Sequence, residues 1–97
     1  LNTVQPRYKL VTGANTWALG VDSARPTTGV NFSVIAVGDA GDPPTITDIA
    51  GTHNLYIGQS IGWDTPHARD VAGLATPLIL TTSAGDVVAV NWTEEKA

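Results

Sequence analysis

The stretch from Val30 to Val37, V-N-F-S-V-I-A-V, is the feature that most restricts the fold of this chain. It contains no proline, glycine or charged residue, and a glycine stands at each end of it. Val30, Phe32 and Val34 fall on one face at a period of two residues, which is the period of a β-strand. The other face is polar at first and becomes apolar from Ile35 onward. The pattern predicts the central strand of a small all-β domain.

Other short runs show the same period and are separated by clusters of turn-forming residues. The sequence predicts three hairpins, over residues 7–21, 45–57 and 77–93. The clearest break is Gly38 to Pro44, where two glycines, two aspartates and two prolines stop any strand or helix. With the central strand this gives about seven short strands, at residues 7–11, 16–21, 30–37, 45–49, 54–57, 77–82 and 87–93. The expected fold is a small antiparallel β-sandwich or barrel.

A length of 97 residues predicts one domain over residues 1–97. Residues 1–6 are expected to be a polar lead-in and residues 94–97 a solvated tail. The chain has at most one short helix, near residues 65–72, where Thr65 suits the N-cap, Pro66 the first helical position and Gly73 the end. The predicted core comprises Tyr8, Leu10, Trp17, Leu19, Phe32, Val34, Ile46, Leu55, Ile57, Leu78, Leu80, Val88, Val90 and Trp92.

Composition narrows the class of function. The chain has no cysteine, so it forms neither a disulfide framework nor a thiolate metal site. Charged residues are only 14% of the chain, and the net charge is −4, which gives no basic stripe for phosphates. No apolar run approaches the length of a membrane span. We therefore expect no nucleic-acid partner and no membrane partner, and we expect a virion or extracellular location.

Motifs for chemistry are weak in this sequence. Gly58 to Gly62 matches G-x-S-x-G, but a serine nucleophile at Ser60 needs an α/β sheet and a histidine after the acid, and His67 comes too early. His53 and His67 lack the spacing of a zinc site and are expected on the surface. We therefore predict no catalytic residue, no metal ligand and no cofactor.

Two further motifs have simple explanations. Asp39 and Asp42 have oxygens suited to calcium, but aspartate in a loop rich in glycine and proline is already explained by turn formation. Asn31-Phe32-Ser33 and Asn91-Trp92-Thr93 match the N-glycosylation pattern, and both asparagines are expected to face away from the core.

The candidate site is a patch in the longest predicted connection. Trp63 stands there outside any strand pattern, and a carboxylate, an imidazole and a guanidinium follow it closely in sequence. Such a patch is suited to stack a sugar ring or to anchor a protein interface. The alternative is that Trp63 folds back and closes one end of the sandwich. The candidate residues are Trp63, Asp64, His67, Arg69 and Asp70.

Thr76-Pro77-Leu78-Ile79-Leu80-Thr81-Thr82-Ser83, followed by Val88-Ala89, resembles a stretch of the head-decoration proteins of lambda-like phages. In that family a T-P-L-x-L segment leads into a hairpin. The resemblance is confined to residues 76–89. It implies a β-rich trimer that clamps a capsid lattice and has no active site.

These observations predict a non-enzymatic structural or binding module on a virion or extracellular surface, with a role in decoration, fibre formation or adhesion. Its partners are expected to be further copies of the chain or a capsid or tail lattice. Ile35 and Val37 on the second face of the central strand, and Val87 and Ala89 on the last strand, leave apolar side chains that such a partner would cover. The alternative is a carbohydrate-binding domain of a secreted glycan-active protein, with a surface glycan as ligand. A small hydrolase using Ser60 is a third hypothesis.

Overall fold

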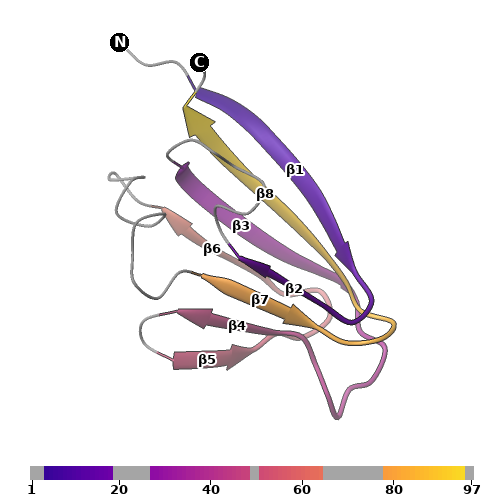
Figure 1. Ribbon diagram of the computed structural model, residues 1–97. Coiled ribbons are helices and arrows are strands. Elements are labelled where there is room, and N and C mark those ends of the chain that lie inside the picture. Colours follow the sequence, from indigo (N-terminus) through magenta and orange to yellow (C-terminus); the bar gives the residue numbers. More distant parts are fainter. Residues whose placement is uncertain (1–3, 19–26, 49–50, 65–77, 96–97) are drawn as a thin grey trace.

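The computed structural model describes residues 4–18, 27–48, 51–64 and 78–95, which form strands, turns and loops but no helix (Figure 1). The predicted helix near residues 65–72 lies outside these residues. The prediction of an all-β chain is confirmed, with one strand more than expected, at residues 60–64. The strands are β1 (Val4–Thr12), β2 (Asn15–Ala18), β3 (Thr27–Ala36), β4 (Thr45–Asp48), β5 (Gly51–Asn54), β6 (Ser60–Asp64), β7 (Ile79–Thr82) and β8 (Val87–Glu95).

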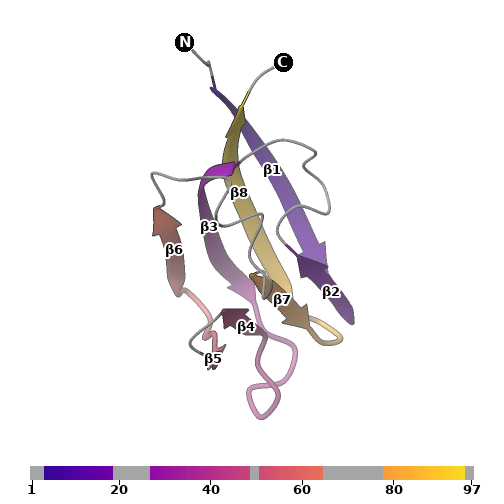
Figure 2. The ribbon, with the colours of Figure 1, turned by 60° about the vertical axis from the view of Figure 1, so that its left-hand side comes forward.

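The strands form two antiparallel sheets that pack face to face, so the predicted β-sandwich is confirmed (Figures 1 and 2). We call them the long sheet, with the order β1-β8-β3-β6, and the short sheet, with the order β2-β7-β4-β5. Only β4 and β5 are consecutive strands of one sheet; every other described strand is followed by a strand of the opposite sheet. The pairs β1 with β8, β2 with β7, β3 with β6 and β4 with β5 give the topology of an eight-stranded jelly roll.

Two of the three predicted hairpins are wrong. β1 pairs with β8 and β2 with β7, so residues 7–18, the described part of the first predicted hairpin, form an arch from one sheet to the other. Residues 78–93 do the same, because β7 and β8 belong to different sheets. Both bends have a glycine with a positive φ, 69° at Gly13 and 85° at Gly85, so the sequence of the bend looked like that of a hairpin turn. The hairpin of β4 and β5 is confirmed, although Gly51 to His53, expected in its loop, lie in β5.

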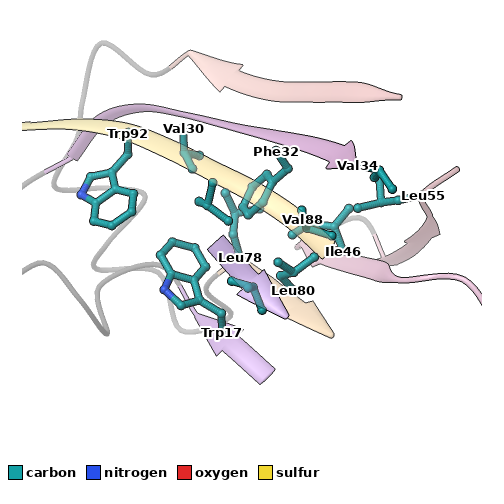
Figure 3. Packing of buried hydrophobic residues seen from close by; sticks show 12 residues of the cluster. Trp17, Val30, Phe32, Val34, Ile46, Leu55, Leu78, Leu80, Val88 and Trp92 are labelled. Atoms are coloured by element: carbon teal, nitrogen blue, oxygen red, sulfur yellow. The ribbon is translucent and has the colours of Figure 1, made fainter. Parts of the chain in front are cut away.

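The core between the sheets contains most of the predicted residues (Figure 3). Trp17 from the short sheet packs edge-on against Phe32, with ring centroids 6.0 Å apart, and lies 5.5 Å from the ring of Trp92. Phe32 has no solvent exposure, and β3 is an inner strand of the long sheet, as predicted. The confirmed core residues are Trp17, Phe32, Val34, Ile46, Leu55, Leu78, Leu80, Val88, Val90 and Trp92.

Tyr8, Leu10 and Ile57 are exposed, so their assignment to the core is wrong, whereas Leu19 lies outside the described residues. On β1 the phase is set by Val11, which is buried, and neighbouring residues of a strand point to opposite faces. Tyr8 and Leu10 therefore lie on the outer face of the long sheet. β1 also begins at Val4, within the expected lead-in.

A bulge in β3 changes the expected faces of its last residues. The register between β3 and β8 shifts between Val34 and Ala36, and Ile35 is the residue at the shift. An extra residue in one strand turns the following side chains to the opposite face. Ile35, at the bulge, is exposed as predicted. Val37, which follows the bulge, packs against the core instead of facing solvent.

The loops at one end of the sandwich are held together by Asp86, which is buried. Its Oδ1 accepts a hydrogen bond from the backbone N–H of Gly38 at 2.9 Å, and its Oδ2 accepts one from Ser83 at 2.8 Å. Its backbone carbonyl accepts a third from Gly13 at 3.2 Å. One carboxylate thus joins the β3–β4 loop and the β7–β8 arch, and the backbone of the same residue holds the β1–β2 arch.

Glu94 lies in β8 and is buried, not in a solvated tail as expected. Its Oε1 accepts a hydrogen bond from Arg7 at 2.7 Å and one from Gln5 at 3.4 Å. The guanidinium of Arg7 also lies 5.9 Å from the ring centroid of Trp92. The charges of Arg7 and Glu94 are therefore paired on the core-facing side of the long sheet.

Candidate functional site

Two residues of the predicted patch, Trp63 and Asp64, lie in a strand and not in a loop. Trp63 and Asp64 are strand residues of β6, opposite Val30 and Gly29 of β3. His67, Arg69 and Asp70 lie outside the described residues. The strand was missed because Gly62 interrupts the alternation of Ile61 and Trp63, although glycine fits a strand where another group approaches closely. Here the Asn31 amide nitrogen would lie 2.9 Å from a Cβ at position 62.

The outer face of the long sheet brings together side chains that the sequence analysis did not combine. Residues opposite each other in antiparallel strands lie on the same face, so the register defines rows across the sheet. One row runs Tyr8, Asn91, Asn31, Gly62 and the next Leu10, Ala89, Ser33, Ser60. The N-glycosylation pattern was the one signal in the sequence that singled out Asn31 and Asn91, which face away from the core as predicted.

Asn31, Ser33 and Ser60 form a hydrogen-bonded cluster on this face. The hydroxyls of Ser33 and Ser60 both donate to Asn31 Oδ1, each at 3.1 Å, and lie 3.2 Å from each other. Ser60 is thus part of a strand and of a polar network. It does not occupy the strand-to-helix turn that a nucleophilic G-x-S-x-G motif requires.

A shallow hollow of about 300 Å³ lies on the outer face beside this cluster. Gly29 has no side chain, which leaves the backbone of the row Arg7, Trp92 and Val30 uncovered as the floor. The outward-facing residues around it are uncharged: Pro6, Asn31, Asn91 and Thr93. Tyr8 lies beside Asn91 in the next strand, although it does not itself line the hollow.

The other half of the face is apolar. Leu10 is 45% exposed and Ile35 is 54% exposed, while Ala89 and Val87 lie on β8 between them. The outer face of the long sheet therefore has a polar half around Asn31 and Asn91 and an apolar half around Leu10 and Ile35.

A second exposed apolar group stands on the connection from β5 to β6. Tyr56 and Ile57 are 59% and 69% exposed, on a turn closed by a hydrogen bond from Gln59 N to Tyr56 O at 2.9 Å. Gly58 has a φ of 79°, as such a turn requires. A groove of about 110 Å³ lies beside this turn, lined by Val37, Ala40, Pro43, Leu55, Tyr56 and Ile57.

The carboxylates of the described loops are engaged within the fold. Asp39 Oδ1 accepts from Gly41 N, and Asp42 Oδ2 accepts from the Ser83 hydroxyl, both at 2.9 Å. His53 Nε2 lies 3.4 Å from Asp48 Oδ1 in the β4–β5 hairpin. Within the part of the chain that the structure describes, no three histidines or acidic residues are grouped so that they could hold a metal ion.

Comparisons with protein-family models, with curated proteins and with solved structures found no match to this chain. Among the described residues, no helix has the length and apolar character needed to cross a membrane.

Proposed function

We propose that this protein is a non-enzymatic structural and binding module of a virion or extracellular surface, and that it associates through the apolar half of the long sheet. The observation that carries the proposal is the inverted arrangement of β1. In the apolar half its outward position holds Leu10, which is 45% exposed, whereas Arg7 and Lys9 lie on the core-facing side. A sheet with one solvated face normally has its polar residues outside and its apolar residues inside. The reverse arrangement favours a partner that covers the outer face.

The edge of β1 argues for association by the face and not by strand pairing. Proline, lysine and inward-pointing charge are the devices by which proteins block strand addition at an edge. β1 combines Pro6, Arg7 and Lys9. The edge of β1 is therefore protected against strand pairing, which favours the outer face as the surface for contact.

The size of the face suits a weak, repeated contact. β1, β3 and β8 are nine to ten residues long and β6 is five. With strands about 4.8 Å apart and about 3.3 Å per residue, the whole face covers about 500 Å² and its apolar half about half of that, well below the ~800 Å² per partner of a standard interface. Association of single copies is then expected in the micromolar range or weaker, and many copies on a lattice would add their contacts. This is consistent with the decoration role that the resemblance implies, which stays a hypothesis.

Sedimentation equilibrium over about 5 to 200 μM tests the proposal. The wild-type chain should gain mass with concentration. The double variant Leu10→Ser with Ile35→Ser should remain monomeric over this range. Tyr56→Ser with Ile57→Ser is the matched control, because it removes comparable exposed apolar side chains from the β5–β6 turn. A wild-type chain that stays monomeric throughout, or a control variant that loses association equally, contradicts the proposal.

A further inference from the structure

The polar half of the outer face carries side chains that donate and accept hydrogen bonds, whereas the apolar half does not, so the polar half suits a different kind of ligand. Tyr8, Asn91, Asn31 and Gly62 form one row across four strands. The three side chains of this row cover about 10 Å, since neighbouring strands are about 4.8 Å apart. That length matches one to two sugar rings.

Asn31 is held in a fixed orientation. Both serine hydroxyls donate to its Oδ1, so the amide nitrogen is directed over Gly62, where no side chain covers it. A donor that is already oriented costs little entropy when it binds a ligand. Asn91 is exposed, and its side chain makes no hydrogen bond within the described residues, so its amide offers both donors and an acceptor.

Tyr8 supplies an aromatic surface at the end of this row. It is 61% exposed and pairs with Asn91, which lines the hollow of about 300 Å³. A flat aromatic ring next to amides that donate and accept hydrogen bonds is complementary to a sugar, whose C–H face is apolar and whose rim carries hydroxyls.

We propose that Tyr8, Asn91 and Asn31 form a binding site for a neutral carbohydrate on the outer face of the long sheet. Arg7 also lines the hollow, but its guanidinium is paired with Glu94 at 2.7 Å on the core-facing side of the sheet, so the site offers no unpaired cation for a phosphate or a carboxylate. The site is separate from the patch expected around Trp63, of which His67, Arg69 and Asp70 lie outside the described residues. It goes beyond the proposed self-association, which depends on Leu10 and Ile35.

The test is a titration of the ¹⁵N-labelled full chain with three neutral oligosaccharides, cellohexaose, maltohexaose and chitohexaose, followed by NMR. At least one should shift the side-chain amide signals of Asn31 and Asn91, with a Kd of about 0.1–10 mM for so open a site. Shifts located elsewhere, or no shift with any of the three at 20 mM sugar (about twice the upper Kd), overturn the proposal.

Variants locate the contact. Tyr8→Ala should weaken binding by at least about tenfold, because the stacking surface is lost. Asn91→Ala should weaken it by about three- to tenfold, the loss expected for one or two net hydrogen bonds. Tyr8→Phe should rescue most of the affinity lost in Tyr8→Ala, and Tyr56→Ala, which removes an equally exposed tyrosine elsewhere, should bind as wild type. Wild-type affinity in Tyr8→Ala overturns the proposal.

The same titration on the Leu10→Ser with Ile35→Ser variant separates the two proposals. If self-association is correct, this variant is monomeric and its polar half is uncovered, so it should bind sugar at least as well as wild type. If self-association fails, sugar binding is still measured directly by the Asn31 and Asn91 signals. Loss of sugar binding in this variant, with the fold intact, contradicts the assignment of the site to the polar half.

Discussion

Gly38 offers a sharp test of how the two sheets are joined. In the native fold its backbone packs against the β7–β8 arch, and the two segments come into contact at Gly38 and Gly85. A Cβ at position 38 would overlap the carbonyl oxygen of Ala84 and stand 2.8 Å from the Cα of Gly85. Both are backbone atoms that cannot turn aside. Gly38→Ala therefore forces the β3–β4 loop away from the arch.

The loss of folding stability in Gly38→Ala can be worked out from the contacts that this movement breaks. Overpacking costs about 1–3 kcal/mol. Moving the loop also lengthens the hydrogen bond from Gly38 N to the buried carboxylate of Asp86, now 2.9 Å, and a bond to a charged group contributes about 1.5–3 kcal/mol. We expect a total loss of about 3–5 kcal/mol, which is a large share of the roughly 5–15 kcal/mol that stabilises a domain. At about 4–8 °C per kcal/mol, the melting temperature should fall by at least about 12 °C.

Thermal and urea unfolding, followed by tryptophan fluorescence, measure this loss. Gly41→Ala is the matched control in the same loop, because its Cβ would meet only the Asp39 side chain, at 3.3 Å, and it should change stability by less than about 0.5 kcal/mol. Gly13→Ala separates backbone strain from crowding, since its Cβ meets nothing within 4 Å but its φ is 69°. It should cost about 1–2 kcal/mol. Equal stability of Gly38→Ala and Gly41→Ala would refute the close crossing of the two loops.

Two further changes test the core and the buried charge. Phe32→Ala should cost about 3–5 kcal/mol by equilibrium unfolding, whereas Ile57→Ala, at a position first assigned to the core and found 69% exposed, should cost less than about 0.5 kcal/mol. Arg7→Gln should cost about 1–3 kcal/mol because it removes a partner of buried Glu94, and this cost should shrink in a Glu94→Gln background, as a double-mutant cycle would show.

The sequence predicted which side chains of a strand share a face, but it was much less informative about which strands pair with one another. Period two identified Phe32 and Val34 as core and the loop from Gly38 to Pro44 as a break, because both properties depend on neighbouring residues alone. Where both faces of a strand carry apolar residues, a period of two does not show which face is directed to the core. On β1, Tyr8 and Leu10 compete with Val11, and pairing with β8 decides for Val11.

The site proposed on the long sheet could not be found from the sequence for a related reason. Its residues come from three strands that are distant in sequence, and only the register brings Tyr8, Asn91 and Asn31 into one row. A search for chemistry along the chain favours clusters of nearby residues, as it did for Trp63 with His67 and Arg69. The bulge at Ile35 also has no local signal, since it depends on how β3 meets β8.

The arch between β7 and β8 allows a final prediction, because a connection between two sheets has to span a longer distance than a hairpin turn within one sheet. A two-residue Asn-Gly turn joins strands that are hydrogen-bonded neighbours, about 4.8 Å apart, whereas packed sheets are about 10 Å apart. Replacing residues 83–86 by Asn-Gly should therefore prevent cooperative folding, and it also removes Asp86 with its bonds to Gly38 and Ser83. Ala84→Asn creates the same Asn-Gly dipeptide at native length on an exposed position, and it should unfold within about 0.5 kcal/mol of wild type. Near-ultraviolet circular dichroism of the tryptophans measures the outcome. A native spectrum in the shortened chain would mean that β7 and β8 pair as a hairpin and that the jelly-roll topology is wrong.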